Sequence, residues 1–387
     1  MRIIEATIYG LRIPFVESFN HSAQARHDSD SIVVRLMTAD GAVGYGEGVA
    51  RAYVTGETVE TSLAQITNRL LPVVLATDFP LLVPGPDPIA ALAPLDAALP
   101  APETSNGVIA WNAARSAVEI ALIDCLLRQQ RLSLAELLPP ARSCVTYSGV
   151  ITGGTVRKAV EHAKFFKLLN LRQLKIKIGE TDTRERVAAV RATVGPDVSL
   201  RLDANGAYDV AQAINALAQL SAFDIAAVEQ PLPRGSLADL AVVKRSSRIP
   251  LMVDESLVTF ADGEALIEAA ACDYFNLRLS KHGGIAPTLK LARLAARAGL
   301  KMQLGSHVGE TAILSAAGRH VAAYLSDLAF VEGSYGTLLL SADLSQDSIS
   351  FGHGGRAPLL RGHGLGVRIR EDLLSRFAHT VIYQRED

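Results

Sequence analysis

Three carboxylate residues recur at a nearly constant spacing through the middle of the chain. Asp203, Glu229 and Asp254 follow one another at almost equal intervals. If each occupies the equivalent point of a repeated unit, the three side chains converge, and converging anions repel unless they are protonated or bridged by a cation. All-oxygen ligands favour hard divalent cations over zinc or copper. The spacing therefore predicts a site for Mg²⁺, or for Mn²⁺.

Three lysines accompany these carboxylates. Lys175 and Lys177 interrupt the apolar run LKIKIG (174–179), and Lys281 follows Asp254 at an interval similar to those between the carboxylates. A buried ammonium is costly unless a negative group lies nearby or the amine is neutral. Lys177 and Lys281 would approach a metal-bound substrate from opposite faces, with Lys175 adding positive charge beside Lys177. A metal and a lysine together can remove a poorly acidic proton next to a carboxylate, because the metal stabilises the enolate that forms.

Eight short apolar segments alternate with alanine-rich amphipathic stretches after about residue 145, and each segment is predicted to be a strand. Their ranges are 145–151, 171–179, 199–205, 225–231, 251–256, 274–281, 301–308 and 329–334. Strands that alternate with helices predict parallel βα units, and eight such units can close into a (β/α)₈ barrel with its site at the carboxyl ends of the strands. An open doubly wound sheet is the alternative, but no G-x-G-x-x-G motif follows the first strand.

The segments on either side of the barrel predict a second domain. Residues 1–140 begin with alternating strands around a turn at 40–41 and continue with helical periodicity, which indicates an α+β capping domain. The barrel is assigned to 141–350, and 351–387 is expected to return to the cap. A polar segment at 16–30, which includes Phe19, has the length of a loop that closes over the barrel mouth.

The composition argues against several other classes of function. The 387 residues are 49% hydrophobic and carry a formal net charge of −2, without the basic stripe of a nucleic-acid-binding protein or the polybasic face of a membrane-binding protein. The N-terminus lacks the apolar core of a signal peptide, and no run reaches the roughly 20 apolar residues of a membrane span. Cys125, Cys144 and Cys272 lie far apart in apolar contexts, which favours free thiols. We therefore expect a cytoplasmic enzyme with a small-molecule substrate.

The motifs at the strand ends resemble those of the enolase superfamily, and within it the muconate-lactonizing-enzyme subgroup. They are KIK (175–177), DAN (203–205), EQP (229–231), DES (254–256) and the lysine of RLSKHGG (278–284). The resemblance covers nearly the whole chain. It implies an α/β fold, namely a modified TIM barrel of the (β/α)₇β type with an N-terminal α+β capping domain, in a homo-oligomer. It also implies that Asp203, Glu229 and Asp254 bind Mg²⁺.

The resemblance further implies how proton transfer is arranged. Lys177 and Lys281 take the acid/base roles, and Lys175 supports Lys177 and the substrate carboxylate. A lysine on the sixth strand argues against the mandelate-racemase branch, which would pair a seventh-strand histidine with a sixth-strand aspartate. The substrate contacts that we expect are Glu332 at the eighth strand, His307 at the seventh strand and Phe19 in the capping loop.

The eighth strand bears on the reaction class. Dipeptide epimerases carry Asp-x-Asp there, whereas this chain has VEGSYG with Glu332 and Ser334, and a glutamate followed by an apolar stretch is similar to muconate cycloisomerases. We expect an isomerase of the muconate cycloisomerase type that acts on a carboxylate. The alternatives are a racemase or epimerase of N-substituted amino acids or dipeptides, and a β-elimination lyase of the o-succinylbenzoate synthase type.

Two alternatives belong to different classes of protein. A Schiff-base aldolase would use a barrel lysine to attack a carbonyl, but the three carboxylates argue against it. A barrel that binds a metal-chelated acid without turnover would not need two lysines beside the metal.

Overall fold

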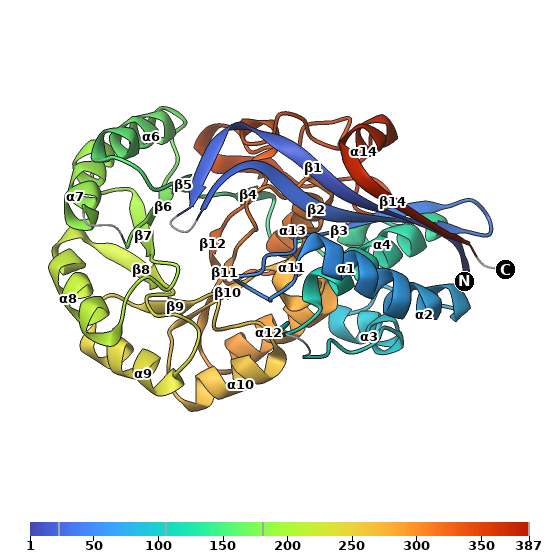
Figure 1. Cartoon of the computed structure of the whole chain (residues 1–387), viewed down its shortest axis with the longest axis horizontal. Coiled ribbons are helices and arrows are strands. Elements are labelled where there is room, and N and C mark those ends of the chain that lie inside the picture. The colour runs from blue at the N-terminus through green and yellow to red at the C-terminus, as the bar shows by residue number, and fades with distance from the viewer. Residues whose placement is uncertain (22–23, 105–106, 180–181, 386–387) are drawn as a thin grey trace.

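The computed structural model describes residues 1–21, 24–104, 107–179 and 182–385. The side chains of residues 17–26 are outside this description. Within these ranges an antiparallel sheet with its own helices lies against one side of a parallel barrel ringed by helices (Figure 1). This arrangement confirms the predicted modified TIM barrel with an N-terminal α+β cap.

The cap is built on a four-stranded antiparallel sheet in the order β14-β1-β2-β3. Three strands come from the N-terminal part of the chain, and the fourth comes from its other end: β1 (Ile3–His21), β2 (Gln24–Thr38), β3 (Val43–Gly48) and β14 (Ala378–Arg385). The chain therefore returns to the cap after the barrel, and Figure 1 shows the red β14 lying along the blue β1.

The cap helices are α1 (Val59–Gln65), η1 (Ile66–Leu70), α2 (Leu71–Ala76), α3 (Pro88–Ala98), α4 (Asn112–Gln130) and α5 (Leu134–Leu137). Helix α4 is buried along nearly its whole length, and β3 lies directly against it. A Cβ atom at Gly46 would lie 2.1 Å from the carbonyl oxygen of Ala117, and one at Gly48 would lie 2.0 Å from that of Ala113. The alternating glycines of VGYGEG therefore permit the close approach of strand and helix.

The barrel contains eight parallel strands in sequence order from β5 to β12. They are β5 (Gly149–Ile151), β6 (Gln173–Lys177), β7 (Ser199–Asp203), β8 (Ile225–Glu229), β9 (Leu251–Val253), β10 (Tyr274–Leu277), β11 (Lys301–Leu304) and β12 (Leu328–Val331). The amide of Ser148, just before β5, donates a hydrogen bond of 2.8 Å to the carbonyl of Val331 in β12. This bond joins the first strand to the last.

One helical segment follows each of the first seven strands, which gives the (β/α)₇β pattern. The helices are α6 (Val156–Leu168), α7 (Thr183–Val194), α8 (Val210–Leu220) with η2 (Ser221–Phe223), α9 (Leu237–Ser246), α10 (Phe260–Glu268), α11 (Leu279–His282) with α12 (Ile285–Arg297), and α13 (Ala312–Tyr324). Between β12 and β14 lie η3 (Gly336–Leu338), η4 (His353–Gly355), β13 (Arg356–Pro358) and α14 (Glu371–Phe377). No helix in the described ranges is long and apolar enough to cross a membrane.

Three local predictions differ from the structure. The strand predicted over 145–151 is split, because β4 (Cys144–Thr146) pairs with β13 outside the barrel and only β5 joins it. The strand predicted over 274–281 ends at Leu277, so Lys281 lies in helix α11. The segment 16–30, predicted to be a loop, falls largely within β1 and β2, whose long hairpin extends toward the segment after β12. There the amide of Val16 donates to the carbonyl of Leu339 at 2.9 Å.

Candidate active site

A cavity of about 290 Å³ opens where the barrel strands end beneath the β1–β2 hairpin. Its polar wall contains Lys175, Lys177, Arg278, His307 and Glu332. Its apolar wall comes from strand β1, from α6 and the residue that follows it, and from the segments after β12. These side chains are Val16, Phe165, Phe166, Leu169, Leu338, Leu339, Leu340 and Phe351. A small molecule with one charged end and one apolar end matches such a cavity.

The three predicted carboxylates lie together at one edge of the barrel. Asp203 and Glu229 are the last residues of β7 and β8 and are paired in register, and Asp254 follows β9 directly. Each is at most 1% exposed. Parallel strands in register bring their carboxyl ends to the same level, so the nearly equal spacing along the sequence translates into proximity.

Lys175 lies among carboxylates. Its Nζ lies 3.2 Å from Asp203 Oδ2 and 3.4 Å from Glu229 Oε2, and it donates to Glu332 Oε2 at 2.8 Å. Burial disfavours the charged amine, but the attraction of these carboxylates outweighs burial, and the pKa of Lys175 lies well above its usual value. The neighbouring carboxylates therefore favour the protonated amine of Lys175.

Lys177 points in the same direction from two residues further along β6. Its Nζ donates to Asp203 Oδ2 at 2.6 Å and to Asn205 Oδ1 at 2.5 Å. Its side chain remains 17% exposed and lines the cavity. Both lysines of this strand line the cavity, and Lys177 is the more exposed of the two, at 17% against 4% for Lys175.

Lys281 lies on the other side of the carboxylates, and its side chain is fully buried. Its Nζ donates to Asp254 Oδ1 at 2.7 Å, to the Asp254 carbonyl at 2.9 Å and to the Asn276 carbonyl at 2.8 Å. Burial outweighs the attraction of Asp254 and lowers the pKa of Lys281. All three hydrogens of the ammonium form are thus used within the protein, and Lys281 is outside the lining of the cavity.

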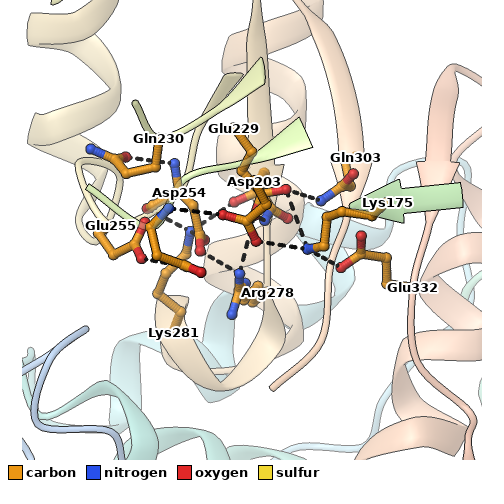
Figure 2. Close-up of polar contacts among 12 residues, drawn as sticks. Lys175, Asp203, Glu229, Gln230, Asp254, Glu255, Arg278, Lys281, Gln303 and Glu332 are labelled. Atoms are coloured by element: carbon orange, nitrogen blue, oxygen red, sulfur yellow. Dashed lines mark hydrogen bonds and ion pairs between the residues drawn. The ribbon is translucent and has the colours of Figure 1, made fainter. Parts of the chain in front are cut away.

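Four polar side chains inside the barrel were missed by the sequence prediction: Arg201, Asn276, Arg278 and Gln303. Glu229 accepts hydrogen bonds from Asn276 Nδ2 at 2.8 Å and from Gln303 Nε2 at 3.2 Å. Arg278 Nη2 lies 3.3 Å from Glu229 Oε1 and also pairs with Asp254 (Figure 2). The two-residue period of a strand could have identified them in the sequence. It puts Arg201 on the same face as Asp203, and Arg278 on the same face as Asn276.

The carboxylates differ in how burial and charge balance. Burial raises the pKa of Asp203, but Lys177 and Lys175 lower it more, so the pKa lies well below its usual value. The pKa of Asp254 is lowered in the same way, because Arg278 and Lys281 outweigh burial. For Glu229, burial and the charge of Asp203 prevail, and its pKa is raised. Asp203 and Asp254 thus stay ionised at neutral pH.

These donors suit a hard divalent cation. All three are carboxylates, and they attract cations that bridge neighbouring strands: Lys175 between Asp203 and Glu229, and Arg278 between Glu229 and Asp254. As the side chains stand in the described ranges, no three histidine, cysteine, aspartate or glutamate residues are close enough together to hold a metal ion. The chemistry of the donors therefore fits Mg²⁺, although the side chains are here paired with protein cations.

Two predicted substrate contacts have distinct surroundings. Glu332 lines the cavity, but Oε2 accepts from Lys175 at 2.8 Å and Oε1 accepts from Arg201 Nη2 at 2.6 Å. Both oxygens are therefore occupied. His307 also lines the cavity, and its Nδ1 has no hydrogen-bond partner in the described part of the chain. Burial and the charge of Arg278 hold the pKa of His307 well below its usual value.

The third predicted contact, Phe19, has a side chain outside the described residues, so that prediction stays a prediction.

The strand ends themselves are held by a further set of hydrogen bonds. Gln230 Oε1 accepts from the amides of Asp254 and Ser256 at 3.0 and 3.1 Å, and Asn205 Nδ2 donates to Glu255 Oε1 at 3.0 Å. These bonds link the ends of β7, β8 and β9.

Comparison with known proteins identifies the family. A family model described as "Mandelate racemase / muconate lactonizing enzyme, N-terminal domain" matches residues 3–139, and one described as "Enolase C-terminal domain-like" matches residues 156–373. The chain belongs to the mandelate racemase/muconate lactonizing enzyme family of the enolase superfamily. The predicted resemblance is confirmed.

Several relatives match over most of their length. An N-succinyl-L-Arg/Lys racemase of Bacillus cereus is 29% identical over 97% of both chains. A hydrophobic dipeptide epimerase of Enterococcus faecalis is 32% identical over 84% of this chain and 87% of its own. A chloromuconate cycloisomerase of Cupriavidus pinatubonensis is 30% identical over 92% of both chains.

Solved structures agree with this fold. The structure of N-succinyl Arg/Lys racemase from Bacillus cereus superposes with a TM-score of 0.88 at 28% identity and covers 100% of both chains. A dipeptide epimerase from Cytophaga hutchinsonii, complexed with Mg and the dipeptide D-Ala-L-Val, gives a TM-score of 0.86 at 27% identity and covers 99% of this chain and 100% of its own.

Proposed function

We propose that this protein is a Mg²⁺-dependent isomerase that forms or quenches an enolate of a carboxylate substrate. The observation that carries the proposal is the convergence of Asp203, Glu229 and Asp254 beside a cavity whose wall contains the amine of Lys177. The family membership and the relatives, which are racemases, epimerases and a cycloisomerase, support isomerase activity.

Each group has a defined task in this proposal. Asp203, Glu229 and Asp254 would hold Mg²⁺, which when bound would supply positive charge to the enolate oxygens. Lys177 transfers the proton at the carbon next to the substrate carboxylate: it removes that proton as general base in racemisation, or delivers a proton as general acid to the enolate formed by carboxylate addition in cycloisomerisation. Lys175 stays charged and attracts the substrate carboxylate. Lys281, which is bonded to Asp254, is the acid/base group of the opposite face, and Asn205 positions Lys177 through its hydrogen bond.

We favour a cycloisomerase of the muconate type. Glu332 already pairs with two cations, Lys175 and Arg201, which leaves no net negative charge there for the α-ammonium of a dipeptide. A substrate without an ammonium group, with two carboxylates or one carboxylate and an apolar part, agrees better with the cations and apolar side chains of the cavity.

A racemase of N-acyl amino acids is the second candidate. The similarity to the Bacillus cereus N-succinyl-L-Arg/Lys racemase over 97% of both chains favours it. An N-acyl amino acid also lacks the free ammonium group, so the occupied Glu332 does not argue against it.

Proton NMR in D₂O tests the proposal. Purified enzyme with Mg²⁺ is incubated with muconates, N-acyl amino acids and dipeptides, alongside Lys177→Met and, as a control outside the cavity, Lys167→Met. We expect deuterium at a carbon next to a carboxylate, dependent on Mg²⁺, retained by Lys167→Met and reduced about 100-fold or more in Lys177→Met. Exchange that survives in Lys177→Met would contradict the assignment of the base.

A further inference from the structure

Helix α6 presents one whole face to the cavity. The lining residues of this helix and of the position after it are Lys158, His162, Phe165, Phe166 and Leu169. Intervals of three and four residues place them on one face of the helix. With a rise of 1.5 Å per residue, this face is about 16 Å long, whereas a fully extended dipeptide spans only about 7 Å. The cavity is therefore longer along α6 than a dipeptide.

The segment that follows β12 forms the wall opposite this helix. It contains only the three-residue helix η3 where the preceding barrel strands are followed by longer helical segments. The amide of Gly354 donates to the carbonyl of Leu169 at 2.7 Å, and the carbonyl of Leu339 accepts from the amide of Val16 at 2.9 Å. These bonds hold the segment beside the end of α6 and beneath the β1–β2 hairpin, and part of the cavity lies between the two walls.

This part of the cavity, which we call the side arm, has apolar walls. Its lining consists of Phe165, Phe166, Leu169, Leu338 and Phe351. Phe165 on one wall is 49% exposed, and Leu338 on the other is 50% exposed. Large apolar side chains that stay half in water around a cavity mark a binding site for an apolar group.

The lining is continuous from the barrel mouth to the side arm. Val150 of β5 is paired in register with Lys175 of β6, and both residues line the cavity. Lys158 and His162, in the first two turns of α6, add polar groups before the phenylalanines begin. The cavity thus changes from polar to apolar along α6, which matches a molecule with a charged end and a long apolar end.

We propose that the side arm binds a long apolar substituent of the substrate, while the substrate carboxylate lies at the barrel mouth. The position of the carboxylate rests on the proposed function. The acyl chain of an N-acyl amino acid and an alkyl chain on a muconate are two sources of such a substituent. Each methylene group buried in the side arm leaves water and thereby strengthens binding. Unsubstituted cis,cis-muconate would leave the side arm unused.

Isothermal titration calorimetry of the Mg²⁺-loaded protein tests the proposal without requiring turnover. One pair of ligands is N-decanoyl-L-phenylalanine and N-acetyl-L-phenylalanine. The other pair is octyladipate and methyladipate, which are saturated analogues of alkylated muconates and cannot cyclise. All are used below the concentrations at which they form micelles. We expect the long member of at least one pair to bind about 100-fold or more tighter than the short member, and that pair identifies the source of the substituent.

Substitutions at the two half-exposed positions locate the binding site of the chain. Phe165→Asp and Leu338→Asp each place a charge in the side arm, so we expect the affinity for the long ligand to fall about 10-fold or more and that for the short ligand to stay within about twofold. Leu168→Asp is the matched control, because Leu168 lies in the same helix, is 81% exposed and is outside the lining. It should bind both ligands as wild type does.

Three results would overturn the proposal. The first is that the long members of both pairs bind no tighter than the short members. The second is that Phe165→Asp and Leu338→Asp weaken long and short ligands equally. The third is that Leu168→Asp weakens the long ligand as much as they do, which would indicate adsorption to the surface. Deuterium exchange of the same N-acyl ligands in D₂O is a separate readout. Tight binding through the side arm without exchange would count against enolate chemistry on N-acyl amino acids and leave the side arm in place.

Discussion

Two regions of the described chain contain buried carboxylates that are compensated in different ways. At the barrel mouth, Asp203 and Asp254 are paired with ammonium and guanidinium side chains. Where the cap meets the barrel, Glu47 accepts from the amides of Thr311 and Leu314 at the start of α13, and Glu119 accepts from the first amides of α12 at 2.8 Å. One region uses side-chain cations, and the other uses fixed helix N-termini.

The pKa values reflect this difference. Full charges outweigh burial at Asp203 and Asp254 and lower their pKa values. Burial outweighs the backbone amides at Glu47 and Glu119 and raises their pKa values to about 7. A carboxylate that must bind a metal has to be charged, and its side-chain partners can move aside. A carboxylate that joins two domains needs only fixed donors.

The largest effect should come from a mouth carboxylate. Replacing Asp203 with Asn removes one charge from the metal donors and the partner of Lys177, so we expect kcat/KM to fall about 10³-fold, which corresponds to about 4 kcal/mol of transition-state stabilisation. Steady-state kinetics at saturating Mg²⁺ would measure this fall. Glu119→Gln is the matched interface control and should stay within tenfold of wild type; equal losses in both variants would remove the distinction between the regions.

An interface carboxylate should matter more for folding. Glu47→Ala leaves the amides of Thr311 and Leu314 and the Thr311 hydroxyl without their acceptor, so we expect the free energy of unfolding to fall by about 3 kcal/mol. Urea unfolding followed by circular dichroism would measure the change. A loss below about 1 kcal/mol would show that water replaces the carboxylate at this helix end.

Magnesium should stabilise the protein only by binding to the carboxylates at the barrel mouth. At Mg²⁺ concentrations about 100 times the dissociation constant, binding adds about 2.7 kcal/mol to the free energy of unfolding. Thermal melts with Mg²⁺ and with a chelator should therefore differ for wild type and for Glu119→Gln, and coincide for Asp203→Asn. A Mg²⁺-dependent shift that persists in Asp203→Asn would place the ion elsewhere.

The pH dependence of stability should show the smallest effect. The folded pKa of Glu119 is about 7 against an ordinary value of 4.5, so between these values the folded state keeps a proton that the unfolded state has released. This residue therefore makes stability fall as pH rises from 4.5 to about 7. The glutamine of Glu119→Gln cannot titrate. Across this window we therefore expect the free energy of unfolding to fall by at least about 1 kcal/mol more in wild type than in Glu119→Gln. Parallel curves for the two proteins would contradict the raised pKa.

The alternation of strands and helices along the sequence was enough to predict the barrel. The spacing of Asp203, Glu229 and Asp254 was enough to predict that they lie at one edge of it. Each of these residues ends or follows a strand, so counting along the chain located it. Lys281 is different, because the chain leaves the strand at Leu277 and turns once as helix α11, which directs the amine to Asp254. Spacing along a sequence does not reveal such a turn.

Other features depended on packing that the sequence does not display. The segment 16–30 is polar like a loop, yet the long register between β1 and β2 keeps most of it in strands. Glu332 follows the last barrel strand, β12, and its partners are Lys175 in β6 and Arg201 in β7. These residues are far from Glu332 in sequence and come near it only because the barrel closes.

The metal site itself is the most direct point at which to test this account. Crystals of the protein soaked in Mn²⁺ would give an anomalous-difference map that locates the ion without reference to any substrate. The account predicts one strong peak bounded by Asp203, Glu229 and Asp254, with the amine of Lys177 facing the same cavity. A map with no peak among these three carboxylates, or with the ion held elsewhere, would contradict it.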